Sequence, residues 1–134
     1  MQYQDFIERV KERAGFDSEQ QAASLIRATL ETLTEHLAGN APAKLAAQLP
    51  AQIGEFITNH KTGENAAGEG FGVEEFVRRT AAKIDSVKPE EAQKQATIVL
   101  NVLREAITTG EFDKIRGTLP AEYDALFKID KSNF

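Results

Sequence analysis

The chain has 134 residues, a mass of 14.8 kDa and 41% hydrophobic residues, enough for about one globular domain with an apolar core. Its formal charge of −5 disfavours non-specific attraction to nucleic-acid phosphates, and the lack of cysteine excludes disulfides, thiolate catalysis and cysteine-based metal sites. The N-terminus has no basic segment before an apolar run, and nowhere do about 18 apolar residues follow one another. We therefore expect a cytoplasmic protein with no nucleic-acid or membrane partner.

Two helices are predicted in the first forty residues. Apolar residues at helical spacing begin at Tyr3, and Gly15 is a natural stop. Ser18 and Gln21 then have the spacing of a capping box, in which each side chain binds the other residue's backbone amide. A long apolar stripe follows, and we expect it to end near residues 39–40, which are Gly-Asn.

A short segment leads from there to Leu49 and Pro50. Proline lacks an amide donor and therefore suits the first turn of a helix, so a further helix is predicted after Leu49. Residues 58–72 then change character, with four glycines and two asparagines, and are predicted to be a linker.

After this linker the first pattern returns at an offset of 70 residues. Without any gap, the offset aligns ten identical pairs, whereas residue frequencies alone would give roughly three or four. The pairs are Phe6/Phe76, Arg9/Arg79, Ala22/Ala92, Leu30/Leu100, Leu33/Leu103, Glu35/Glu105, Lys44/Lys114, Leu49/Leu119, Pro50/Pro120 and Ala51/Ala121. We interpret the repetition, including the recurring Leu-Pro-Ala, as an internal duplication.

The duplication predicts the architecture. The expected parts are a first unit at residues 1–57, the linker at 58–72, a second unit at 73–128 and a C-terminal tail at 129–134. A unit of about 57 residues makes a marginal core alone, so we expect the two units to pack as one domain. The predicted fold is an all-α bundle of two tandem, duplicated three-to-four-helix units with approximate internal two-fold symmetry.

The two long helices differ in composition. Where the first has Thr29 and Thr32, the second has Val99 and Val102, so its apolar arc is wider. A helix that is apolar on more than one side is usually buried on more than one side. Residues 90–109 are therefore predicted to form the central helix, ending at Gly110.

These features together resemble a known family. Each unit has an aromatic residue early in its first helix, a long Ala/Leu-rich second helix, and the junction QLPAQ or TLPAE. In these respects the chain, over residues 3–127 apart from the linker, resembles the bacterial family called domain of unknown function 2267. The resemblance implies an all-helical duplicated domain and brings no catalytic residues with it.

No constellation of reactive residues stands out. His36 lies beside the apolar stripe of the second helix, which favours a partly buried histidine over a ligand or a base. His60 opens the linker without the spacing of a helical metal site. The glycines of GEGFG at residues 68–72 lack the strand, lysine and hydroxyl of a phosphate loop and are interpreted as linker residues. We predict no catalytic residue, no metal ligand and no cofactor, and we name no binding residue.

Charged residues at helical spacing are expected to form ion pairs. Asp5, Arg9 and Arg13 follow one another at the four-residue spacing of helix-surface pairs, and the same spacing separates Glu74 from Arg78 and Glu75 from Arg79.

One further polar pair recurs in both units. Arg9 with Glu35, and Arg79 with Glu105, are hypothesised to tie the first helix of each unit to its own second helix. The functional alternative is that the two arginines form two equivalent anion-binding sites. This is disfavoured because each arginine comes with a glutamate that neutralises its charge.

The basic residues of the second unit are candidates for a nucleic-acid surface. Arg78, Arg79 and Lys83 cluster on its first helix, with Lys114 and Arg116 later, but acidic residues interleave with them. Nucleic-acid binding needs a cleaner patch.

The function expected from these patterns is therefore one of interaction. A duplicated helical scaffold without convergent reactive groups suggests a non-catalytic module that binds a protein partner or self-associates, through an inter-unit groove or exposed apolar ends. The aromatic candidates for such ends are Phe112, Tyr123, Phe127 and Phe134. The alternative is a small apolar ligand bound in a cavity between the long helices. An enzyme ranks third, since it would need His36 or a carboxylate pair in a cleft.

Overall fold

The computed structural model describes residues 1–60, 70–84 and 88–127, and all regular structure in these ranges is helical. The helices are α1 (Tyr3–Ala14), α2 (Glu19–His36), α3 (Ala41–Ala47), α4 (Ala51–Thr58), α5 (Val73–Ala82), α6 (Pro89–Ala106), α7 (Thr109–Thr118), the 3-10 turn η1 (Ala121–Tyr123) and α8 (Asp124–Phe127). We call α1 to α4 the first half and α5 to α8 the second half. The predicted all-α fold is confirmed.

Local sequence signals account for most helix boundaries. Gly15 follows α1 with a φ of 71°, a left-handed conformation that glycine adopts without a Cβ clash. The capping box predicted at the start of α2 is present, since the Gln21 amide donates to Ser18 Oγ and the Ser18 amide donates to Gln21 Oε1. Pro89 occupies the first position of α6, where its missing amide leaves no bond unmade.

Two predicted helix ends were placed too far along the chain. Helix α2 ends at His36 because Leu37 is extended, and Gly39, with a φ of 59°, lies in the turn beyond. Helix α6 ends at Ala106, and Gly110 belongs to α7, which Thr108 caps by accepting a hydrogen bond from the Glu111 amide. A glycine placed after an apolar stripe therefore did not mark the helix end in either case.

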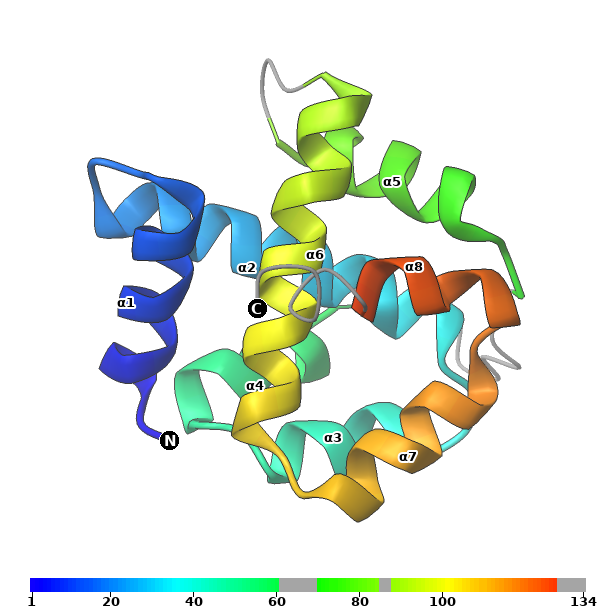
Figure 1. Ribbon diagram of the computed structural model, residues 1–134. Helices are drawn as coiled ribbons and strands as arrows, with labels where there is room; N and C mark the ends of the chain where they lie inside the picture. The colour runs from blue at the N-terminus through cyan, green and yellow to red at the C-terminus, as the bar shows by residue number, and fades with distance from the viewer. Residues whose placement is uncertain (61–69, 85–87, 128–134) are drawn as a thin grey trace.

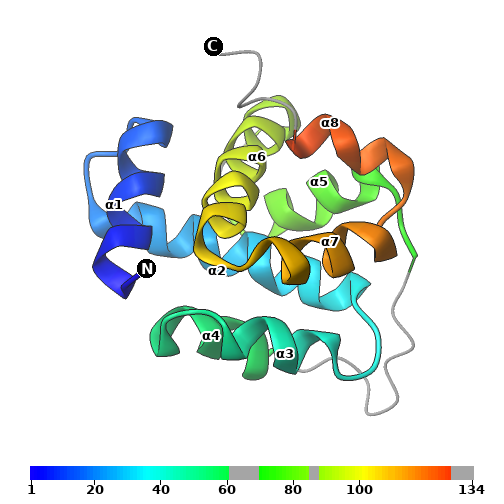
Figure 2. The same cartoon turned by 60° about the horizontal axis from the view of Figure 1, so that its bottom comes forward.

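The long helices α2 and α6 cross in contact near the middle of the molecule (Figure 1). Helix α1 packs on α2 and also on α6 of the second half, while α5 packs on α6 and also on α2 of the first half. Helices α3 and α4 form a layer on one side of α2 (Figure 2), and α4 contacts α2 while α8 contacts α6. Each half therefore covers part of the other.

The core contains side chains from both halves. Phe6 and Phe76, the aligned aromatic residues of α1 and α5, are both fully buried. Leu49 and Leu119, which precede the two repeated prolines, are also buried and belong to the same cluster. Pro50 and Pro120 lie directly before α4 and η1. The repeated Leu-Pro therefore places a core leucine before a helix start, as the sequence predicted.

The prediction of a single central helix was wrong. Helix α2 is buried along its length as extensively as α6, and both pack against helices of each half, α2 against α1, α4, α5 and α6, and α6 against α1, α2, α5 and α8. The reason lies in Thr29, Thr32 and Thr34, whose hydroxyls donate to the carbonyls four residues earlier at 2.7–2.9 Å. With its hydroxyl bonded in this way, threonine is buried on α2 where the aligned positions 99 and 102 of α6 carry valine.

The aromatic residues expected to form exposed apolar ends are largely buried. Tyr123 is fully buried and donates its hydroxyl to the Phe71 carbonyl at 2.9 Å. Phe127 is buried against Phe112, which is itself half-buried, and Phe134 lies outside the described residues. Among the described large apolar side chains, Met1 alone is exposed, at 39%. The expectation of aromatic ends available for docking was therefore wrong for Tyr123 and Phe127.

No described helix is long and apolar enough to cross a membrane. The predicted linker begins at the end of α4, and its residues 61–69 lie outside the described chain, as does the predicted tail at 129–134.

Candidate functional site

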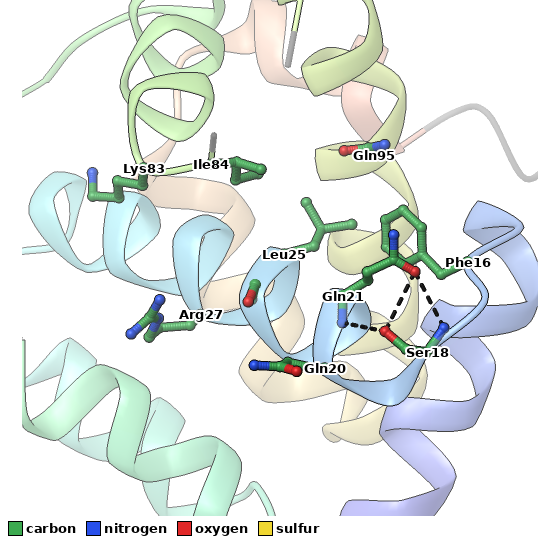
Figure 3. Close-up of a pocket in the computed structure, with 10 residues that line it drawn as sticks. Phe16, Ser18, Gln20, Gln21, Leu25, Arg27, Lys83, Ile84 and Gln95 are labelled. Carbon is green, nitrogen blue, oxygen red and sulfur yellow. Dashed lines mark hydrogen bonds between the residues drawn. The ribbon is translucent and has the colours of Figure 1, made fainter. Parts of the chain in front are cut away.

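An open groove lies between α2, α6 and the end of α5, with a volume of about 500 Å³ (Figure 3). This volume falls within the range of small-molecule sites in proteins. We call it the α2–α6 groove. Its lining residues are Phe16, Ser18, Gln20, Gln21, Ser24, Leu25, Arg27, Lys83, Ile84 and Gln95.

The groove has an apolar floor and a polar rim. Phe16, Leu25 and Ile84 supply apolar surface, and Leu25 is almost fully buried. The other lining residues carry hydroxyl, amide or cationic groups, and no carboxylate is among them. In Figure 3, Lys83 and Arg27 lie at one end, with Phe16 and Gln95 at the other. In a chain with more acidic than basic residues, this groove is a cationic and amide-rich surface.

Some rim side chains already have partners within the protein. Gln21 Oε1 accepts hydrogen bonds from the amides of Asp17 and Ser18, which fixes both side chains of the capping box. Lys83 Nζ lies 3.1 Å from Glu35 Oε2 and 3.0 Å from Thr32 Oγ1, so its charge is largely compensated.

The remaining rim groups are free to bind. The side chains of Gln20, Ser24, Arg27 and Gln95 have no hydrogen-bond or ion-pair partner among the described residues. These four side chains are therefore the groups of the groove available to a ligand.

A second groove, of about 430 Å³, lies between the starts of α5 and α6. Val73, Val77 and Pro89 form its apolar part, and Glu74, Glu90, Arg78 and Gln93 complete the lining. It differs from the α2–α6 groove in carrying carboxylates of both helices.

A polar cluster of four residues surrounds Glu35 on α2. We define the Glu35 cluster as Glu35, Arg79, Lys83 and His60. Glu35 binds Arg79 Nη1 at 3.2 Å, Lys83 Nζ at 3.1 Å and His60 Nε2 at 2.8 Å, and its side chain is only 18% exposed. Burial by itself raises the pKa of the Glu35 carboxyl, but hydrogen bonds from His60, Lys83 and Arg79 outweigh it and hold the pKa below its usual value.

An equivalent but more exposed cluster surrounds Glu105 on α6. We define the Glu105 cluster as Glu105, Arg9 and Arg13. Arg9 Nη1 lies 2.8 Å from Glu105 Oε1 and Arg13 Nη1 lies 2.9 Å from Glu105 Oε2, with the carboxyl side chain 31% exposed. Burial again raises the pKa of this carboxyl, while hydrogen bonds from Arg13 and Arg9 bring it below its usual value.

The ion pairs predicted within each half were therefore wrong. Arg9 does not bind Glu35 but Glu105 of the other half, and Arg79 binds Glu35 of the other half. The reason is that α1 lies against α6 and α5 lies against α2. The recurrence of the pair was a correct signal of contact, but spacing along the chain could not say which copy of the glutamate each arginine meets.

The other predicted helix-surface pairs are confirmed only in part. Glu75 binds Arg79 across four residues and Arg78 across three, which lowers the pKa of Glu75 to about 2, with Arg78 as the larger influence. Arg78 therefore pairs with Glu75 and not with Glu74, while Arg9 and Arg13 bind Glu105 and not Asp5.

The remaining basic candidates are partly paired as well. Arg116 is ion-paired with Asp124 through a short contact, and Arg79 and Lys83 belong to the Glu35 cluster. Of the five basic candidates, Arg78, Arg79, Lys83 and Arg116 thus bind acidic residues, and Lys114 has no ion-pair partner among the described residues.

The two histidines have structural surroundings. His36 is 6% exposed, packs against Phe71 and Tyr123, and its Nε2 lies 3.3 Å from the Thr118 carbonyl oxygen. This agrees with the prediction of a buried histidine. His60 belongs to the Glu35 cluster, and no group of three metal-ligating side chains is present in the described ranges.

No binding residue was predicted from the sequence, so the α2–α6 groove was not identified before the structure. One signal was available. Gln95 stands in the alignment where the first half has Leu25, so a polar residue interrupts an otherwise apolar stripe on α6. Gly-rich or histidine motifs were more conspicuous, but none of them lines the groove.

The described fold places the chain in the class of all-α proteins with two crossing long helices. Over residues 3–126 the sequence matches the family described as "Uncharacterized conserved protein (DUF2267)", and the chain belongs to this family. The resemblance seen in the sequence is thereby confirmed. A search of curated proteins gave no match.

Proposed function

We propose that this chain is a non-catalytic helical interaction module that binds a segment of a partner protein in the α2–α6 groove. The observation that carries the proposal is the groove itself, with its apolar floor, polar rim and lack of lining carboxylates. Protein interfaces commonly combine an apolar centre with a hydrogen-bonding rim. The buried aromatic residues Tyr123 and Phe127 have no part in this binding surface.

We further propose that the module is one domain made of two duplicated units related by an approximate two-fold axis. Three features support this. Helices α1 and α5 begin 70 residues apart, and α2 and α6 both begin and end 70 residues apart. The packing of α1 on α6 is matched by that of α5 on α2. Arg9, Arg13 and Glu105 correspond at the same offset to Arg79, Lys83 and Glu35.

The second candidate function is small-molecule binding between the long helices. The volume and position of the groove favour it, since both α2 and α6 contribute to the lining. The ligand would have to carry polar groups as well as an apolar part, because most of the lining is polar. This differs from the purely apolar ligand that the sequence suggested.

The proposed function is tested by blocking the groove. Ser24 lies half-buried on its α2 side, so Ser24→Arg places a large side chain in the groove. Gln52→Arg, at an exposed position of α4, adds the same charge away from the groove and serves as the control. Affinity capture from the source cell followed by mass spectrometry should give a partner held by wild type and Gln52→Arg but lost by Ser24→Arg. A partner retained by Ser24→Arg would contradict the proposal.

A thermal-shift screen with small molecules tests the second candidate. A compound that stabilises wild type and Gln52→Arg, but not Ser24→Arg, would favour small-molecule binding over a protein partner. Sedimentation velocity over a range of concentrations tests self-association, which Ser24→Arg should abolish if the groove holds a second copy of the chain.

A further inference from the structure

Gln95 stands at an unusual position in the α2–α6 groove. It lies six residues after Pro89, the start of α6, as Leu25 lies six residues after Glu19, the start of α2. Leu25 is buried in the core, whereas Gln95 is only partly buried and lines the groove beside it. Two aligned positions therefore line the same groove, and Leu25 contributes an apolar side chain while Gln95 contributes an amide.

The amide of Gln95 is not explained by the fold. Ala92, Ala96 and Val99 continue the buried stripe of α6 on either side of it. A leucine there would extend this stripe, whereas the Gln95 amide stays open to the groove, since it is not among the fully buried side-chain atoms that lack a hydrogen-bond partner. Among the described residues Gln95 has no hydrogen-bond partner. Departures from local consistency of this kind are characteristic of functional positions.

The chemistry of the side chain indicates what it binds. A glutamine amide presents a donor and an acceptor side by side on one plane, which matches the N–H and C=O of a peptide backbone. The apolar floor of Phe16, Leu25 and Ile84 accepts an uncharged side chain from the same segment. Arg27, exposed and without a described partner at the opposite end, favours an acidic side chain there.

We propose that Gln95 is the specificity-determining residue of the groove and hydrogen-bonds the main chain of an extended, acidic peptide segment of the partner protein. This inference rests on the proposed function and adds to it the ligand class and the residue that recognises it. Gln95 then has opposite effects on folding and binding, because the residue that interrupts the buried apolar stripe of α6 is the one that the ligand uses.

The test uses the full chain and short random peptides displayed on phage. Peptides selected on wild type are synthesised, and their affinities are measured by fluorescence anisotropy for wild type, Gln95→Leu, Gln93→Leu and Ser24→Arg. Gln93 is an exposed glutamine on the same helix that lines the other groove, so Gln93→Leu is the matched control. We expect acidic peptides whose binding falls by about tenfold or more in Gln95→Leu, as for loss of buried hydrogen bonds.

The same variants give the folding readout. Gln95→Leu should raise the thermal midpoint by a few degrees because it completes the apolar stripe, while Gln93→Leu should leave both midpoint and affinity close to wild type. If Gln95 has no role in binding, Gln95→Leu should raise the thermal midpoint without lowering the affinity for the peptides.

The outcomes separate the two proposals. Peptides that bind wild type and Ser24→Arg equally would overturn the groove as the binding site. Peptides lost by Ser24→Arg but retained by Gln95→Leu would overturn only the role of Gln95. Failure to select any peptide that prefers wild type over Ser24→Arg would overturn the peptide as the ligand class.

Discussion

The Glu35 and Glu105 clusters are the same arrangement in two settings. In each, a glutamate near the end of a long helix receives two cations from the first helix of the other half. The Glu35 cluster is more buried and adds His60 as a third donor, whereas two arginines hold Glu105 at a more exposed place. The difference shows that the same helix packing can hold polar contacts of unequal strength. The contacts of the more buried cluster contribute more to stability, because ion pairs and hydrogen bonds are stronger where water is excluded.

The comparison extends to the core residues of α1 and α5, where the largest effects are expected. Phe6→Ala and Phe76→Ala should each lower the free energy of unfolding by about 3–5 kcal/mol, because each removes a fully buried aromatic side chain. Urea denaturation followed by circular dichroism measures the effect. If a variant does not fold, the corresponding Phe→Leu change gives a milder test.

A single cooperative transition is expected for both phenylalanine variants, since the two halves share one buried cluster. Two separate transitions, each sensitive to only one of the changes, would contradict the packing of the halves as one domain.

Double-mutant cycles sharpen the comparison of the ion pairs. For Arg79 with Glu35 we expect a coupling of about 1.5 kcal/mol, since both side chains are largely buried. For Arg9 with Glu105, where the arginine is 46% exposed, we expect about 0.5 kcal/mol. Alanine variants and urea denaturation give both values.

The pairs within each half provide the control for these cycles. Arg9 with Glu35 makes no ion pair in the structure, so its coupling should be close to zero. If the coupling energy of Arg9 with Glu35 is larger than that of Arg9 with Glu105, the arrangement in which each arginine binds the glutamate of the other half is wrong.

The pH dependence of stability should reflect both carboxyl groups. The pKa values of Glu35 and Glu105 are lowered in the folded state, so each contributes stability above the unfolded value near 4.5 and loses it as pH falls through the folded pKa. The stability difference between wild type and Glu35→Gln should therefore be greatest near neutral pH and shrink in acid. Urea denaturation at a series of pH values measures it.

Glu105→Gln should show the same sign of pH dependence. A difference between wild type and either variant that stays constant down to about pH 3 would mean that the carboxyl is not bound as a carboxylate in the folded protein.

The smallest effects are expected at the buried threonines of α2. Thr29→Val reproduces the residue of α6 and should change the free energy of unfolding by less than about 1 kcal/mol, because its hydroxyl binds only a carbonyl of its own helix. Thr32→Val should cost more, since the Thr32 hydroxyl also accepts a hydrogen bond from Lys83 Nζ. Thermal denaturation of both variants measures the loss of stability in each. Equal losses would show that the hydrogen bond from Lys83 to Thr32 does not stabilise the fold.

Much of the local structure was predictable because its causes lie within a few residues. The capping box of Ser18 and Gln21, the stop at Gly15 and the start at Pro89 depend on backbone groups that are neighbours along the chain. The helix ends after α2 and α6 were missed because extended residues, Leu37 and Ile107, end the helices before any glycine. Burial of Thr32 was missed because the hydrogen bond of its hydroxyl to the preceding turn is not visible in a hydrophobicity pattern.

The candidate site was less predictable than the fold. Its lining comes from the α1–α2 turn, α2, the end of α5 and α6, which are brought together only by the crossing of the long helices. Gln95 was visible as a break in the apolar stripe, but nothing local indicated that it would face Leu25 across a groove.

By itself, the sequence determined the helices, the apolar face of each and the pairs of residues that recur at an offset of 70, because periodicity and capping act over a few residues. Only the tertiary structure decided that Arg9 meets Glu105 and Arg79 meets Glu35, and that the rim of a groove forms where α2 crosses α6. The physical reason is that either copy of the glutamate offers the same charge to the arginine. The packing of α1 on α6 and of α5 on α2 selects between them.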